Sequence, residues 1–201
     1  MACGLQERAT NRAWHGDRLI EIRWHGRGGQ GAITAAKIFA TAAFKSGYTG
    51  AVMVPTFGTE RRGAPIFSSL KIAREKIYDL SPIETPDIVV VLDHLLLDEV
   101  DVAKGLKEGG LIVLNTPKPL AAYDFGGVRL ALADVSALSV QAGLPQGRVN
   151  SGIIGVLCRA LDIVPFAEIL AEIETEFEGK KPQANVQAAR LAYESAVVGV
   201  A

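Results

Sequence analysis

The sequence has few residues that bind metals or form cross-links. Its 201 residues include two cysteines, Cys3 and Cys158, and three histidines. The cysteines are far apart and Cys158 falls in an apolar helical pattern, which argues against a disulfide framework and favours a reducing compartment. Four cysteine ligands for an iron–sulfur cluster are not available, and no metal-ligand spacing is present. We therefore expect no metal site in this chain and a cytoplasmic location.

The sequence also lacks a strong charge of one sign and long apolar runs. Its net charge is −1 at pH 7, so no overall field attracts nucleic acid or a membrane surface. No apolar run approaches the roughly 20 residues that span a bilayer. Residues 1–17 mix charges of both signs without an apolar segment, unlike a secretory signal. No Gly-x-Ser-x-Gly motif offers a hydrolase nucleophile, and we predict no catalytic residue.

Strand and helix patterns alternate along the chain, and 49% of its residues are hydrophobic, enough for a substantial core. This alternation predicts an α/β fold: a mostly parallel, Rossmann-like sheet flanked by helices, with a helical C-terminal third. We expect one domain over residues 18–201, preceded by a disordered extension over residues 1–17. Strands are predicted from Leu19 into the glycine-rich turn and at 50–54, 87–92, 110–114 and 128–133, a hairpin insertion at 66–72 and 76–80, and helices at 32–44, 94–106, 134–141, 149–161, 165–177 and 182–198.

A glycine-rich turn follows the first predicted strand. Gly26, Gly28 and Gly31 have the spacing G-x-G-x-x-G and precede a helix rich in small residues. Such a turn presents backbone N–H groups to a phosphate, or lets a strand and a helix pack closely. A dinucleotide site also needs an acidic residue at the end of the second strand. That strand ends Val-Met-Val-Pro without a carboxylate, so independent NAD(P) binding is disfavoured.

Two motifs together resemble a known family. The gamma subunit, or gamma domain, of 2-oxoacid:ferredoxin oxidoreductases has Gly-x-Gly-Gly-Gln-Gly after a strand and a later loop Tyr-Gly-x-Glu-x-Arg-Gly. This chain has the first at residues 26–31 and the second at residues 57–63, with Phe57 in place of the tyrosine. Further similarities lie at residues 93, 115, 150–152, 180–182 and 185. The resemblance covers Arg18 to the C-terminus and is strongest to the pyruvate (pyruvate synthase) branch.

The resemblance implies a subunit that is not active alone. Such enzymes oxidatively decarboxylate a 2-oxoacid with coenzyme A, giving acyl-CoA, carbon dioxide and two electrons for ferredoxin. Thiamine diphosphate, Mg²⁺ and iron–sulfur clusters lie on other subunits in this family. The implied partners are thiamine-diphosphate-binding alpha and beta subunits and a ferredoxin-like iron–sulfur subunit, with coenzyme A at the subunit interface. An isolated gamma subunit should self-associate through its apolar docking face.

Two other functions remain open from the residues: a free-standing dinucleotide-binding oxidoreductase, and a scaffold subunit whose glycine turn contacts only protein. Individual residues have alternatives too. Arg27 pairs with a phosphate or partner carboxylate, or lies in solvent; Gln30 caps the helix or bonds a partner. Asp93 is favoured as a helix cap, although the carboxyl ends of parallel strands should bring Asp93, His94 and Asn115 together. His25 is expected to be packed and hydrogen-bonded, and Cys158 to fill the core.

The predicted ligand- and interface-binding residues come from both motifs and two later asparagines. The Glu60–Arg62 cluster is favoured as a partner or ligand contact, because an exposed ion pair contributes at most about 1 kcal/mol to stability. The predicted set is Gly26, Arg27, Gly28, Gly29, Gln30, Gly31, Glu60, Arg61, Arg62, Asn115 and Asn150.

Overall fold

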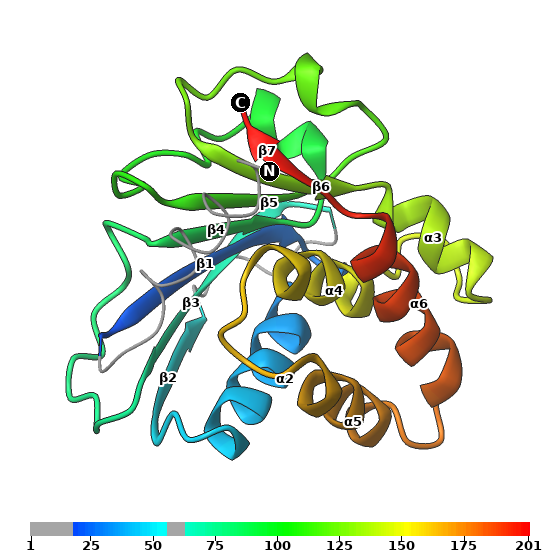
Figure 1. Cartoon of the computed structure of the whole chain (residues 1–201), viewed down its shortest axis with the longest axis horizontal. Coiled ribbons are helices and arrows are strands. Elements are labelled where there is room, and N and C mark those ends of the chain that lie inside the picture. The colour runs from blue at the N-terminus through cyan, green and yellow to red at the C-terminus, as the bar shows by residue number, and fades with distance from the viewer. Residues whose placement is uncertain (1–17, 56–62) are drawn as a thin grey trace, which may run out of the picture.

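The computed structural model describes residues 18–55 and 63–201, so the extension predicted for residues 1–17 lies outside it. Within these ranges, seven strands form one sheet in the order β2-β3-β1-β4-β5-β6-β7 (Figure 1). They are β1 (Ile20–Arg27), β2 (Gly50–Pro55), β3 (Pro65–Ala73), β4 (Ile88–Val91), β5 (Leu111–Asn115), β6 (Arg129–Ala133) and β7 (Val197–Val200).

The sheet is parallel at its centre and antiparallel toward both edges. β1, β4, β5 and β6 pair in parallel, whereas β3 runs antiparallel to β1 and β2, and β7 antiparallel to β6. The α/β class and the parallel core are confirmed. The antiparallel strands make the sheet mixed, and one of them, β3, lies beside the first strand β1.

The α-helices lie on one side of the sheet (Figure 1). They are α2 (Ala32–Lys45), α3 (Val135–Gln141), α4 (Asn150–Ala160), α5 (Phe166–Glu176) and α6 (Pro182–Ser195), which confirms the helical C-terminal third. Inward-facing residues such as Ile22, Trp24 and Val90 form the main core with these helices. The opposite face is covered by short 3₁₀ helices and loops over a smaller cluster that includes Val89 and Ile112.

The helix predicted over residues 94–106 is wrong beyond its first turn. A 3₁₀ helix, η2 (His94–Asp98), is followed by turns. The buried guanidinium of Arg23 donates through Nη2 to the carbonyl oxygens of Val102 at 2.8 Å and Lys104 at 2.7 Å. Because those carbonyls bond to a side chain on β1, they are not available to a helical ladder.

The hairpin predicted from residues 66–72 and 76–80 is also wrong in its second strand. Residues 76–80 form no strand, and β3 pairs with β2 and β1 instead. The loop does hold a polar anchor: the buried amine of Lys71 on β3 contacts Asp79 at 2.6 Å and Ser81 at 3.3 Å. The alternating pattern of residues 76–80 therefore belongs to a loop fixed by a buried lysine.

The last helix ends earlier than predicted. α6 stops at Ser195, and the valine-rich segment that follows forms β7 rather than continuing to residue 198. Valine favours strands because its branched side chain packs well on a pleated surface. Gly199 lets Leu120 approach, since a β-carbon there would lie 2.7 Å from the Leu120 side chain. Within the described ranges, no helix is long and apolar enough to cross a membrane.

Candidate functional site

The glycine turn joins β1 to α2 and uses its glycines for different purposes. Gly29 has φ +94° and open space around the position of a β-carbon, so it serves the turn. Gly31, the N-cap of α2 with φ +86°, lies against Asn150: a β-carbon there would be 2.9 Å from the amide nitrogen of that side chain. A β-carbon on Gly26 would lie 3.1 Å from that of Ala32. Close packing therefore accounts for two of these glycines.

The two sequence motifs meet in space. The N–H of Gly28 donates to the carbonyl of Ala64 at 3.0 Å, and the N–H of Gly63 donates to the carbonyl of Gly28 at 3.2 Å. These bonds extend the β1–β3 ladder into the turn, so the C-terminal end of the second motif lies beside the first. Glu60, Arg61 and Arg62 lie outside the described residues.

Arg27 is neutralised inside the chain. Its Nε donates to Oδ2 of Asp93 at 2.8 Å, its Nη2 to Oε1 of Glu99 at 2.5 Å, and its Nη1 to the carbonyl of Gly63 at 3.1 Å. Hydrogen bonds to Glu99 and Asp93 raise the pKa of Arg27 above its ordinary value. These bonds tie the glycine turn to the segment after β4, an arrangement that neither prediction for Arg27 included.

Gln30 and Asp93 complete this network. Gln30 accepts from the N–H of Arg27 at 2.8 Å and donates to Oδ2 of Asp93 at 3.2 Å. The predicted helix cap is wrong for Gln30, because α2 begins without a side-chain cap. Asp93 does cap η2 through the N–H of Leu95 at 3.0 Å, as predicted. Burial acts to raise the pKa of Asp93, but the bonds from Leu95, Arg27 and Gln30 hold it below its ordinary value.

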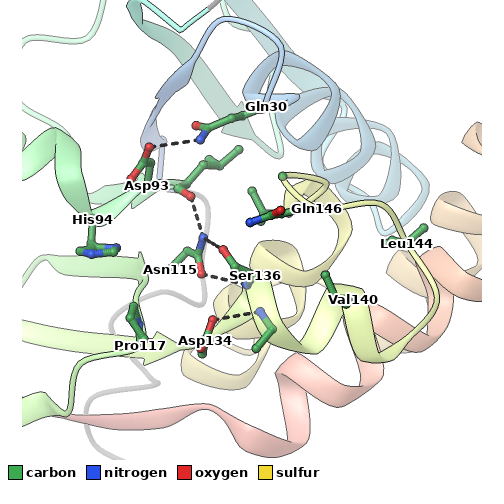
Figure 2. Close-up of a pocket in the computed structure, with 14 residues that line it drawn as sticks. Gln30, Asp93, His94, Asn115, Pro117, Asp134, Ser136, Val140, Leu144 and Gln146 are labelled. Atoms are coloured by element: carbon green, nitrogen blue, oxygen red, sulfur yellow. Dashed lines mark hydrogen bonds between the residues drawn. The ribbon is translucent and has the colours of Figure 1, made fainter.

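An open cavity of about 760 Å³ lies at the carboxyl ends of the parallel strands (Figure 2). Asp93 and His94 after β4 and Asn115 at the end of β5 all line it, which confirms that the sheet brings these residues together. Parallel α/β sheets bind ligands at this edge. The remaining lining residues include Gln30, Asp134, Ser136, Val140 and Gln146.

Asn115 shapes this cavity rather than projecting freely into it. Its Nδ2 donates to the carbonyl of Leu92 at 2.8 Å and to Oγ of Ser136 at 3.0 Å, while Oδ1 accepts from the N–H of Ser136 at 3.2 Å (Figure 2). Asn115 thus joins the end of β4 to the start of α3. Sequence reasoning missed Asp134, which caps α3 through the N–H of Ala137, although a carboxylate directly after a strand is the same signal as Asp93.

His25 and Cys158 are buried, as predicted. His25 accepts through Nε2 from Nε of Arg23 at 3.0 Å, and its ring lies 5.9 Å from that of Phe67. Burial, with a smaller effect from the Arg23 charge, lowers the pKa of His25 to about 4, so it is neutral at pH 7. Burial raises the pKa of the Cys158 thiol. Neither residue is placed for acid–base or nucleophilic chemistry at the cavity.

The arrangement of side chains and strands limits which cofactors the described part of the chain could hold. Among the described residues, no group of three or more His, Cys, Asp or Glu side chains could hold a metal ion. Beside the glycine turn, where a dinucleotide fold has the acidic end of a parallel strand, this chain has the start of the antiparallel β3 at Pro65. The start of β3 therefore offers no carboxylate to bind the hydroxyl groups of a ribose.

The known proteins that this chain resembles agree with one another in family. The family model described as pyruvate ferredoxin/flavodoxin oxidoreductase matches residues 21–195. The chain is 44% identical to the pyruvate/ketoisovalerate oxidoreductases common subunit gamma of Thermococcus litoralis, over 90% of this chain and 98% of that protein. It is 41% identical to pyruvate synthase subunit PorC of Methanothermobacter marburgensis, over 88% and 97%.

A solved structure agrees with these relatives. The pyruvate oxidoreductase subunit PORC of Thermotoga maritima superposes with a TM-score of 0.78 at 32% identity, covering 90% of this chain and 99% of that one. The family match runs from β1 to the end of α6, so it includes the glycine turn, the parallel strands and the helices beside them, but not β7. The chain therefore belongs to the pyruvate ferredoxin/flavodoxin oxidoreductase family, as a gamma-type subunit.

Proposed function

We propose that this chain is the gamma subunit of a cytoplasmic complex that oxidatively decarboxylates a 2-oxoacid, pyruvate in the first place, with coenzyme A and passes the electrons to ferredoxin. The names of its relatives, which refer to pyruvate, ketoisovalerate and pyruvate synthase, support this reaction. Thiamine diphosphate with Mg²⁺ and the iron–sulfur clusters would be supplied by partner subunits. Thiamine diphosphate stabilises the carbanion that decarboxylation forms.

The chain's own contribution is to build a wall of the active-site entrance. The observation that carries this proposal is the network of Arg27, Gln30, Asp93 and Glu99, which fixes the glycine turn at the rim of the large cavity. Its carboxylates are engaged in ion pairs and caps, so they are suited to positioning rather than to proton transfer. A rigid rim of this kind holds a substrate path open between subunits.

Apolar side chains beside the cavity indicate where partners dock. Leu95, next to the cavity residue His94, is 52% exposed, and Val140 on the cavity wall is 51% exposed. Exposed apolar residues beside a recess suit a protein interface better than a free surface. We propose that the thiamine-diphosphate-binding subunits cover this rim, and that coenzyme A enters at the junction. Exposure of the same rim would let the isolated chain self-associate.

Two other functions make different predictions. A free-standing dinucleotide-binding oxidoreductase would bind NAD(P) alone, but the turn has no ribose carboxylate and its arginine is already paired. A pure scaffold would support complex assembly without affecting the apparent affinity for coenzyme A. Substitutions in the rim distinguish the two roles. They should raise the KM for coenzyme A if the chain builds the entrance wall, and leave it unchanged if the chain is only a scaffold.

The test is affinity purification of the tagged full chain under anaerobic conditions from the organism that encodes it. Recovery of thiamine-binding and iron–sulfur chains, with pyruvate- and CoA-dependent viologen reduction, would support the proposal. Val140→Lys and Leu95→Lys should reduce recovery of these partners. Phe44→Lys is the matched control, because Phe44 is 56% exposed near the far end of α2. Recovery of the chain alone, with NAD(P) binding, would contradict the proposal.

A further inference from the structure

A second cavity, of about 340 Å³, lies between the start of α4 and the α5–α6 connection. It is separate from the rim proposed to meet the thiamine-binding subunits, and the two cavities share only Leu144 among their lining residues. The lining residues that matter chemically are Arg148, Asn150, Phe177, Lys180, Lys181 and Asn185.

The charge around this second cavity is of one sign. Arg148, Lys180 and Lys181 line it, and no aspartate or glutamate does. None of the three forms an ion pair with another residue in the described ranges, in contrast to Arg27. Like charges around one cavity without a counterion repel one another, and an anion would relieve that repulsion.

The lysine corner, formed by Lys180 and Lys181 directly before α6, is held in a fixed and unfavourable backbone conformation. Lys181 has φ +60° and is the one residue other than glycine with positive φ in the described part of the chain. Asn185 donates to the carbonyl of Lys181 at 3.0 Å and accepts from Oγ of Ser151 at 2.9 Å, which ties the corner to α4. Such a conformation persists only where surrounding contacts determine it, and it occurs often at binding sites.

A buried amide points to the same ligand. Asn150 is only 5% exposed and lines the cavity from the first turn of α4. Among the described residues, none is within hydrogen-bonding geometry of its side-chain amide, although its neighbour Ser151 and the nearby Asn185 are paired with each other. An acceptor oxygen inside the cavity would give this amide the partner that it lacks among the described residues.

We propose that this second cavity binds the phosphate group of a phosphate monoester. A phosphate offers a compact double negative charge and several acceptor oxygens, which match a forked guanidinium, two ammonium groups and an amide donor. The 14-residue helix α6 begins directly after the lining residue Lys181, so the positive end of its dipole lies beside the cavity. Leu144 and Phe177 leave an apolar surface for the organic part of the ester. This inference does not depend on the proposed oxidoreductase reaction.

The test is isothermal titration of the full chain with inorganic phosphate and, separately, with phenyl phosphate. Arg148→Gln and Lys181→Asn should each weaken binding about tenfold or more, the usual loss for one charge-assisted hydrogen bond. Asparagine tolerates the left-handed conformation, so Lys181→Asn removes the charge without straining the backbone. Lys104→Gln, an exposed lysine outside the cavity, should bind as the parent does.

If phenyl phosphate binds more tightly than inorganic phosphate, the ligand is a monoester. If the two bind equally, the cavity recognises the phosphate group alone and free phosphate is its ligand. The proposal is overturned if neither compound binds at millimolar concentration, or if both variants bind as tightly as the parent. Binding of hexaglutamate without phosphate binding would also overturn it, because the cavity would then be a contact for an acidic segment of a partner. This titration does not measure viologen reduction, so a negative result would not argue against the proposed oxidoreductase reaction.

Discussion

The amide nitrogen of Asn150, at the start of α4, lies 2.9 Å from the position that a β-carbon on Gly31 would occupy. The turn that opens α2 and the first residue of α4 are therefore packed backbone against side chain. This contact explains why the third glycine of the motif is needed even without a ligand.

Gly31→Ala should lower the free energy of unfolding by about 3 kcal/mol, from the left-handed backbone and the overlap with Asn150 together. Gly29→Ala is the matched control: it has a similar φ, but no atom lies within 4 Å of the added carbon. It should cost only about 1 kcal/mol. Urea unfolding of both variants measures the difference, and equal losses would mean that the contact with Asn150 is unimportant.

Stability should depend on pH through His25. The folded pKa is about 4 and the ordinary value is 6.5, so the unfolded chain binds more protons than the folded chain between these values. Stability should therefore be full above pH 6.5, fall as the pH drops toward 4, and lose up to about 3 kcal/mol from this group. His25→Gln keeps an acceptor for Arg23 and should flatten the profile. An unchanged profile in urea unfolding would assign the effect to other groups.

The pair between Arg27 and Asp93 should stabilise the glycine turn modestly. Arg27→Gln should reduce the free energy of unfolding by about 1 kcal/mol, because the pair is only partly buried. Asp93→Asn should have a comparable effect, and the double variant should lose less than the sum of the two. Strict additivity in this double-mutant cycle would show that the 2.8 Å contact contributes nothing to stability.

Cys158 should be unreactive in the folded chain. Its thiol is buried and its pKa is raised, and the thiolate is the form that reacts with disulfide reagents. In a Cys3→Ser background, a thiol reagent should label no cysteine in buffer and one cysteine in urea. Rapid labelling of the folded variant would show that the core around α4 opens readily.

Much of the fold was predictable from local patterns. The continuous apolar run before Asp93 predicted the buried strand β4, and the small-residue helix after the glycines predicted α2, because both patterns follow directly from burial. The carboxyl-end argument also placed Asp93, His94 and Asn115 at one cavity.

What failed depended on partners distant in the sequence. Residues 94–106 look helical, but their carbonyls bond to Arg23 on another strand. β3 pairs with β1 and β2 rather than with the next alternating segment. The carboxylates that pair with Arg27 likewise come from residues brought near it only by the sheet. No local pattern specifies such contacts, because tertiary packing decides them.

The role of this chain in the active-site entrance can be measured by pyruvate- and CoA-dependent viologen reduction by the partner subunits, assayed anaerobically with and without this chain. We expect that adding the chain restores activity, and that Val140→Lys, but not Phe44→Lys, weakens the restoration or raises the KM for coenzyme A. Full activity of the partner subunits without this chain would contradict its role in building the active-site entrance.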